Sequence, residues 1–172
     1  MNFLGKNHIG YQAIAFGNHV FFGIDPTTNQ SFETPFHQAT PEEVNWALAA
    51  SKEAFDQYRL IPVEKRVRFL KAIPEKLKAN KELLIRWFCA ESGLPEDRAE
   101  TEFARSCFQF TFYAEAVETG YALELKIDSA DPDRKPNPKP ALTKLNVPVG
   151  PEVVYGASNF PFAYSTLGGD VA

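Results

Sequence analysis

The sequence VVYGASNFP, residues 153–161, predicts a short apolar strand, a tight turn and the start of a helix. Residues 153–155 favour the strand, Gly156 ends it, and Pro161 suits the first turn of the helix. A strand that leads directly into a helix is the opening of a parallel strand–helix layer, where ligands bind at the carboxyl ends of the strands. We therefore predict an α/β fold with Asn159 at a ligand-binding edge.

Four helices are predicted before this segment, between residues 40 and 120. The first begins with a capping box formed by Thr40 and Glu43. The later helices begin near Pro62, Asn80 and Pro95, and Pro74 should kink or divide the second one. Each helix carries apolar residues at helical spacing, which predicts one face packed against a core. These residues are Val44, Ala47, Leu48, Phe55 and Tyr58; Val67, Leu70, Ile73 and Leu77; Leu83, Leu84, Trp87 and Phe88; and Ala99, Phe103, Cys107, Phe110, Ala114 and Val117.

Extended structure is predicted on both sides of these helices. Residues 8–36 are rich in aromatic and β-branched side chains and predict two or three short strands. After the helices, residues 121–147 predict an extended arm, because four prolines fall within residues 131–140. Residues 148–172 hold only the first strand, turn and part of a helix, so we expect the parallel-sheet layer to be truncated.

Composition narrows the possible functions. The chain has 172 residues, of which 44% are hydrophobic and 23% charged, as expected for a globular protein. The net charge of −4 is spread without a basic stripe and no apolar run reaches 18 residues, so neither nucleic acid nor a membrane is an expected partner. The two separated cysteines, Cys89 and Cys107, suit a reducing, cytoplasmic location. His8, His19 and His37 are far apart, and no metal site is predicted.

Asn159 has two interpretations from its surroundings alone. Its uncharged amide, at a ligand-binding edge, could stabilise a developing oxyanion without titrating. Asparagine is also a favoured helix cap, and spacing alone favours this simpler role. Gly156, three residues earlier, would let the backbone approach a ligand closely because it has no Cβ.

Several motifs resemble one family. The segment PVGPEVVYGASNFPFA, residues 148–163, resembles the part of the aldehyde dehydrogenase superfamily in which a buried strand leads into Asn-Phe-Pro. GASNFP followed by GGD resembles the branch of NADP-dependent enzymes that oxidise α-ketoglutaric semialdehyde (2,5-dioxopentanoate). ATPEEV at 39–44, ESGLP at 91–95 and DRKP at 133–136 are similar to further segments of that branch, in the same order. The resemblance covers nearly all of the chain from about residue 25.

The resemblance implies a role for each part of the chain. In this family the side-chain amide of Asn159 would hold the oxyanion of a thiohemiacetal together with a backbone N–H of the catalytic cysteine. The backbone of Gly156, Ala157 and Ser158 would run along the nicotinamide side of NADP (or NAD). The strands and helices of residues 1–120 would belong to a Rossmann-like cofactor-binding domain. Residues 121–147 would be a β oligomerisation element of a full-length homo-oligomer that oxidises a small aldehyde.

Two groups that the family's reaction needs are missing from the sequence. No motif supplies the nucleophilic cysteine or the glutamate that activates water. Cys89 and Cys107 lie on apolar helical stripes, where buried, inert thiols are expected. We therefore expect an amino-terminal fragment of an aldehyde dehydrogenase that is inactive alone. The alternative is a non-catalytic helical module, derived from the family, that serves binding or assembly.

Overall fold

The structure is a computed structural model, and it describes residues 5–165. Within this range the chain forms three antiparallel two-stranded sheets and four α-helices. The strands are β1 (Asn7–Ile9), β2 (Gln12–Ile14), β3 (Val20–Asp25), β4 (Gln30–His37), β5 (Lys126–Asp128) and β6 (Leu142–Lys144). The helices are α1 (Pro41–Tyr58), α2 (Val63–Lys78), α3 (Lys81–Ser92) and α4 (Glu96–Thr119), and a short 3-10 turn, η1 (Tyr121–Leu123), follows them.

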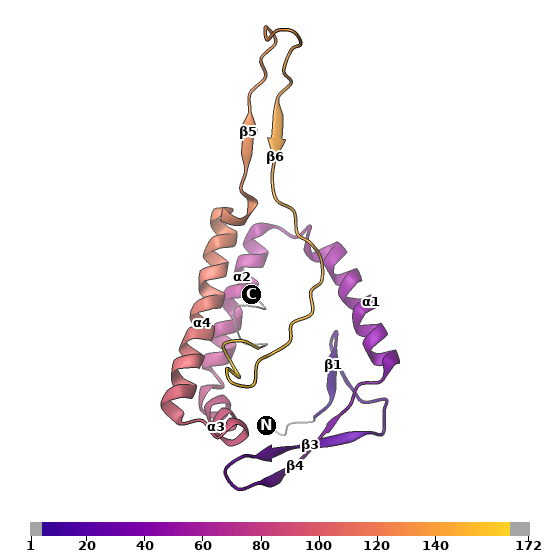
Figure 1. The fold of residues 1–172 in the computed structure, drawn as a ribbon, viewed down its shortest axis with the longest axis vertical. Coiled ribbons are helices and arrows are strands. Elements are labelled where there is room, and N and C mark those ends of the chain that lie inside the picture. The colour runs from indigo at the N-terminus through magenta and orange to yellow at the C-terminus, as the bar shows by residue number, and fades with distance from the viewer. Residues whose placement is uncertain (1–4, 166–172) are drawn as a thin grey trace.

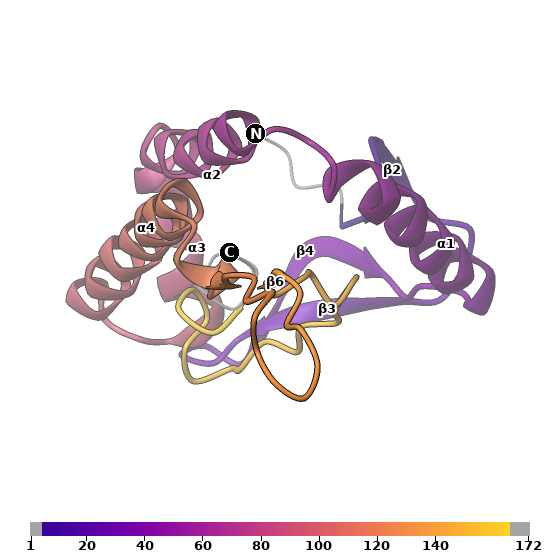
Figure 2. The same ribbon diagram turned by 90° about the horizontal axis from the view of Figure 1, so that it is seen from above.

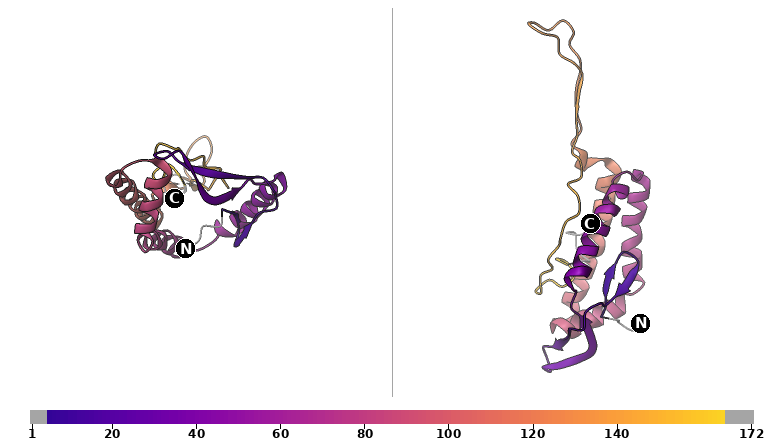
Figure 3. Two further views of the ribbon diagram at one scale, coloured as in Figure 1. Left: turned by 90° about the horizontal axis from the view of Figure 1, so that it is seen from below. Right: turned by 90° about the vertical axis from the view of Figure 1, so that its right-hand side faces the viewer.

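The helices form two groups. Helices α2, α3 and α4 pack together on one side of the molecule, whereas α1 lies on the other side (Figures 1 and 2). The β3–β4 hairpin lies below them and contacts α3, where the ring of Phe32 meets that of Trp87. The β5–β6 hairpin projects well beyond the end of α4 (Figure 3). From β6 the chain returns along the molecule towards α3.

The amino-terminal end of α1 is built around Glu43. Its Oε2 accepts the backbone N–H of Thr40 at 2.8 Å, and the Thr40 Oγ1 accepts the N–H of Glu43 at 3.2 Å, which confirms the predicted capping box. The Oε1 of Glu43 also accepts the N–H of Phe16 and the side-chain amide of Asn7. Glu43 is fully buried, and the backbone hydrogen bond from Thr40 is the main reason why its pKa is lowered. Glu43 therefore completes the capping box and also connects Asn7 of β1 and the backbone at Phe16 to α1.

The core lies between α2, α3 and α4. The predicted stripes of α2 and α4 supply buried residues to it, whereas in α3 only Phe88 of the predicted residues is buried, together with the unpredicted Ile85. Ala99, Phe103, Cys107, Phe110 and Ala114 of α4 are all buried. Val67 and Leu70 of α2 are buried against the second half of α4, while Ile85 and Phe88 of α3 are buried against its first half. Helix α2 continues through Pro74 and is not divided there. Gly93 and Gly120 end α3 and α4 with φ values of 68° and 70°, which glycine adopts without steric strain.

The prediction of a buried face on α1 is wrong. Val44, Leu48 and Tyr58 are 47%, 53% and 42% exposed, and Glu43 is the one buried residue of this helix. The described part of the chain packs against α1 mainly through β1 and through the Phe16 ring, which stacks on Trp46. Helical spacing of apolar residues predicts which face is apolar, but it does not predict what covers that face.

The strand and helix predicted around residues 153–161 are also not formed. Residues 151–157 have no strand partner, and Tyr155 is 90% exposed. Residues 161–165 form turns instead of a helix, and residues 166–172 lie outside the described range. A single strand cannot satisfy its backbone groups without a neighbour, which explains why the apolar run remains irregular here. The α/β class itself holds, but with antiparallel hairpins as its β structure.

Candidate functional site

Residues 156–165, which we call the Asn159 loop, form a closed series of turns. The N–H of Ala157 donates to the carbonyl of Tyr164 at 3.0 Å, joining the two ends of the loop. Inside it, the N–H of Phe160 donates to Ala157 and the N–H of Tyr164 donates to Phe160, both at 3.2 Å. These bonds restrict the backbone on both sides of Asn159.

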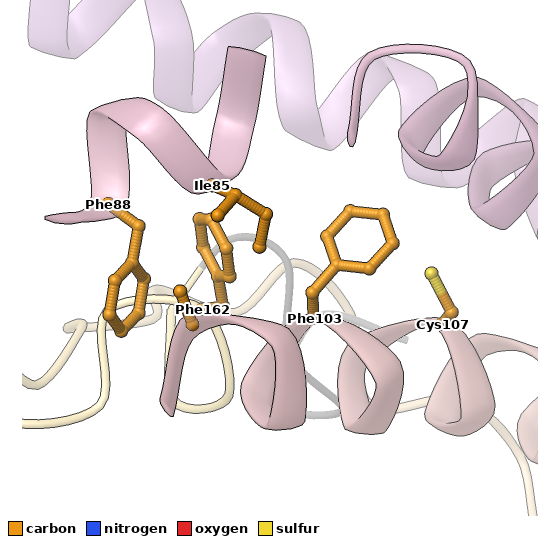
Figure 4. Close-up of a cluster of buried hydrophobic side chains, with 6 residues drawn as sticks. Ile85, Phe88, Phe103, Cys107 and Phe162 are labelled. Carbon is orange, nitrogen blue, oxygen red and sulfur yellow. The ribbon is translucent and has the colours of Figure 1, made fainter. Parts of the chain in front are cut away.

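The loop is attached to the helical core through Phe162. This side chain is 7% exposed and packs between α3 and α4, with its ring centroid 4.8 Å from that of Phe88 and 6.3 Å from that of Phe103 (Figure 4). The neighbouring Ala163 is also buried. Burial of one phenylalanine side chain stabilises by about 1.5–3 kcal/mol, so Phe162 is the main apolar anchor of the loop.

A buried carboxylate of α4 binds the backbone of the same loop. Glu102 is 2% exposed, and its Oε2 accepts the N–H groups of Phe162 at 3.2 Å and Ala163 at 3.4 Å. Its Oε1 accepts the Nε–H of Arg98, one turn earlier on α4, at 2.7 Å. The buried charge therefore has hydrogen-bond donors on both of its oxygens.

Arg98 also contacts the loop at Asn159. Its Nη2 donates to the backbone carbonyl of Asn159 at 3.4 Å, and its guanidinium carbon lies 4.3 Å from the centre of the Phe160 ring. A guanidinium over an aromatic face is an attractive arrangement. Glu102 and Arg98 together hold the loop by its backbone at Phe162 and Ala163 and at Asn159.

The side chain of Asn159 is left available. The residue is exposed, and within residues 5–165 its side-chain amide has no hydrogen-bond partner. The predicted helix after it is not formed, so Asn159 caps no helix in the part of the chain that the structure describes. An exposed, uncharged N–H donor on a tied backbone is suited to binding an oxygen of a ligand.

The three residues before Asn159 differ in their surroundings. A Cβ on Gly156 would lie 3.1 Å from the Cβ of Ser165, so glycine permits close packing within the loop itself. Ala157 is half-buried and Ser158 is exposed. The roles of these residues at a cofactor, predicted from resemblance, stay predictions.

A cavity of about 440 Å³ adjoins the loop, and most of its lining is aromatic or apolar. Ser158 and Phe162 border it from the loop side, and Glu91 borders it from α3. Burial raises the pKa of the Glu91 carboxyl, although much of this residue is in contact with solvent. The other lining residues are Phe32, Thr34, Phe36, Leu84, Trp87, Phe88, Ser92 and Pro161.

The expectation of a buried, inert thiol is confirmed for Cys107, whereas Cys89 is only half-buried. Cys107 is buried in the same cluster as Phe162, and burial raises its pKa, which keeps the thiol protonated (Figure 4). Within residues 5–165, no group of three His, Cys, Asp or Glu side chains is arranged to hold a metal ion. Over the same range, none of the helices combines the length and hydrophobicity that crossing a membrane requires.

Sequence reasoning missed Glu102 and Arg98. A signal for Glu102 was present, because it lies three residues after Ala99 and next to Phe103, within the apolar stripe of α4. A charged residue at a core position is rare unless it has partners. The partners themselves, 60 residues further along the chain, could not be predicted from spacing on one helix.

The sequence is similar to a family model and to individual proteins that are named as semialdehyde dehydrogenases. The model of the aldehyde dehydrogenase family matches residues 17–168. Alpha-ketoglutaric semialdehyde dehydrogenase 2 of Azospirillum brasilense is 38% identical over 100% of this chain and 33% of its own length. Alpha-ketoglutaric semialdehyde dehydrogenase of Acinetobacter baylyi is 36% identical over 96% of this chain and 32% of its own length. The chain thus spans about a third of these relatives.

Solved structures share the fold. An NAD-dependent benzaldehyde dehydrogenase from Corynebacterium glutamicum superposes with a TM-score of 0.66 and 20% identity, over 78% of this chain and 28% of the other. Betaine aldehyde dehydrogenase from Staphylococcus aureus, solved with NAD+, gives a TM-score of 0.67 and 20% identity, over 76% and 26% of the two chains. At this identity the likeness concerns the fold alone.

Proposed function

The chain belongs to the aldehyde dehydrogenase family, and from this premise we propose that it supplies the Asn159 half of an oxyanion site for the oxidation of an aldehyde. The Asn159 side-chain amide would donate to the oxygen that becomes negatively charged when a thiol adds to the aldehyde carbonyl. The exposed amide on a tied loop is the observation that supports this proposal.

The loop suits this role because the backbone that carries the Asn159 amide is held before the reaction. A donor stabilises a developing charge most strongly when no reorganisation is needed at the moment of reaction. Here the backbone of residues 159–163 is held by Arg98 and Glu102 and by the buried Phe162 ring. Asparagine stays neutral at any physiological pH, so the donor would not be lost by titration.

The proposed substrate is α-ketoglutaric semialdehyde, converted to the carboxylate. The names of the two relatives with 38% and 36% identity support this choice. The proposed cofactor is NADP or NAD, which when bound accepts the hydride. Gly156, Ala157 and Ser158 would lie along its nicotinamide side. Their small side chains leave the backbone accessible there, and Gly156 and Ser158 are exposed.

We propose a cytoplasmic enzyme that forms a homo-oligomer through the arm of residues 121–147, in which the exposed Ile127 and Leu142 offer apolar surface. We also propose that the 172-residue chain is inactive alone, because no motif in it supplies the nucleophilic cysteine or the glutamate that activates water, and because the buried Cys107 has a raised pKa. Reduction of NADP or NAD by the purified chain with this semialdehyde would disprove the last point.

The role of Asn159 can be tested in a chimera. This chain would replace the matching third of the A. brasilense enzyme, and the remaining two thirds of that enzyme would complete the protein. Asn159→Ala should then lower kcat by about 10²–10³-fold, as loss of one oxyanion donor does, with a much smaller effect on KM. An unchanged kcat in Asn159→Ala would rule out the proposed role.

A further inference from the structure

We propose that Glu102 is a positioning residue for Asn159: its buried carboxylate fixes the backbone of the Asn159 loop and so aims the side-chain amide. The proposal rests on the role proposed above for Asn159. It assigns a function to a residue on α4 that contacts neither substrate nor cofactor in this scheme.

Burying the Glu102 carboxylate carries a cost in lost hydration. A carboxylate is rarely found at 2% exposure, and it persists in a core only when hydrogen bonds compensate for the lost water. Three donors do so here, and two of them are the N–H groups of Phe162 and Ala163. The Glu102 charge therefore favours the one loop conformation that brings these two groups to it.

The two N–H groups that Glu102 binds are connected to Asn159 by a short segment of backbone. Phe162 and Ala163 follow Asn159 by three and four residues. The intervening backbone is closed by the hydrogen bond from Tyr164 to Phe160. Few free torsion angles remain between the two fixed N–H groups and the Cα of Asn159. Fixing one end of this segment therefore restricts the other.

Arg98 links the Glu102 carboxylate to the other end of this segment, at Asn159. It donates Nε–H to Glu102 and Nη2–H to the Asn159 carbonyl. Glu102 thereby holds the guanidinium in the orientation that reaches Asn159. The backbone of Asn159 is bound on one side, whereas its side chain is left for a ligand.

A purely structural role for Glu102 is the competing explanation. An Arg–Glu pair one turn apart on a helix contributes little to stability when it is partly exposed, and the Arg98 side chain is 37% exposed. Such a pair would not need a buried glutamate. The buried position of Glu102 adds hydrogen bonds from the N–H groups of Phe162 and Ala163. The strength of these two hydrogen bonds is therefore the quantity to measure.

Amide hydrogen exchange in the whole chain tests the anchoring. In Glu102→Ala, the amides of Phe162 and Ala163 should exchange about tenfold faster or more, which corresponds to losing roughly one charge-assisted hydrogen bond. The side-chain amide resonances of Asn159 should shift as well. Glu100→Gln is the matched control, because it removes the Lys81 ion pair on the surface of the same helix and should change neither signal.

Glu102→Gln covers the case in which Glu102→Ala does not fold. Its neutral oxygen still accepts a hydrogen bond, but more weakly than a carboxylate, so the same two amides should exchange at an intermediate, raised rate. Unchanged exchange at Phe162 and Ala163 in either folded variant would overturn the proposal.

A double-mutant cycle in the chimera tests whether Glu102 acts through Asn159. Glu102→Gln should lower kcat with little change in KM, and the double variant with Asn159→Ala should be no slower than Asn159→Ala alone. If the fold-decrease in kcat of the double variant equals the product of the two single decreases, Glu102 acts independently of Asn159 and the proposal is overturned. If Asn159→Ala leaves kcat unchanged, the proposed function fails, while the exchange experiment still decides whether Glu102 holds the loop.

Discussion

The rings of Phe88 and Phe162 lie 4.8 Å apart, centroid to centroid, and join α3 to the Asn159 loop. Both side chains are almost fully buried, at 3% and 7% exposure. The loop is therefore part of the main hydrophobic core, together with Phe103 and Cys107 of α4. A change at Phe162 should affect both the stability of the helices and the placement of Asn159.

Phe162→Ala should lower the free energy of unfolding by about 3–5 kcal/mol, because it removes a buried ring and leaves a cavity. Urea unfolding followed by circular dichroism measures this change. Tyr155→Ala is the control, since Tyr155 is 90% exposed, and it should leave the unfolding midpoint nearly unchanged. Equal midpoints for the two variants would show that Phe162 is not part of the core.

Stability should fall in acid partly through Glu43. Its pKa in the folded chain is below its ordinary value of 4.5, so its contribution is fully present above that value and is lost as the pH falls through the folded pKa. Thermal unfolding across this acid range checks the effect. Glu43→Gln should be less stable than the unaltered chain at neutral pH, and this difference should shrink below pH 4.5. A difference independent of pH would contradict the assignment.

Thr40→Ala should destabilise the chain by about 1 kcal/mol, because it removes the side-chain oxygen that caps α1. Thr101→Ala is a matched control in the interior of α4. There alanine has the higher helix propensity and should be neutral or stabilising. Denaturant unfolding of both variants measures the effects, and the same sign for both would argue against the cap.

Cys107 should react slowly with an aromatic disulfide reagent in the folded chain. Burial raises its pKa above the ordinary value of 9.0 and also restricts access. A Cys89→Ser variant isolates its thiol, which should become rapidly reactive when urea is added. Rapid labelling without denaturant would instead identify Cys107 as an accessible nucleophile and would reopen the question of a catalytic cysteine within this chain.

The sequence predicts the helices well because their signals are local. Thr40 and Glu43 cap one helix with their own side chains, and Gly93 and Gly120 end two others through their left-handed φ values. The apolar stripe of α4 is likewise visible in its spacing. These features depend on residues within a turn or two of each other, so no knowledge of the remaining chain is required.

The errors arise where the structure depends on distant partners. The apolar residues 153–155 predict a strand, but strand formation needs a neighbouring strand that the described residues do not provide. The apolar stripe of α1 gives no indication of what covers it. For Glu102, the apolar stripe of α4 indicates a buried position, but the spacing does not reveal its partners, the N–H groups of Phe162 and Ala163. The role of Asn159 follows from resemblance and stays a prediction, which Asn159→Ala in the chimera tests.

The position of α1 has a consequence for how the molecule unfolds. This helix meets α2 at its last turn, where the Tyr58 ring lies 6.2 Å from that of Phe69, and otherwise contacts mainly β1 (Figure 1). Cooperativity requires shared contacts, and few join α1 to the core of α2, α3 and α4. We therefore expect the α1 segment to exchange its amide hydrogens faster than the core that carries the Asn159 loop.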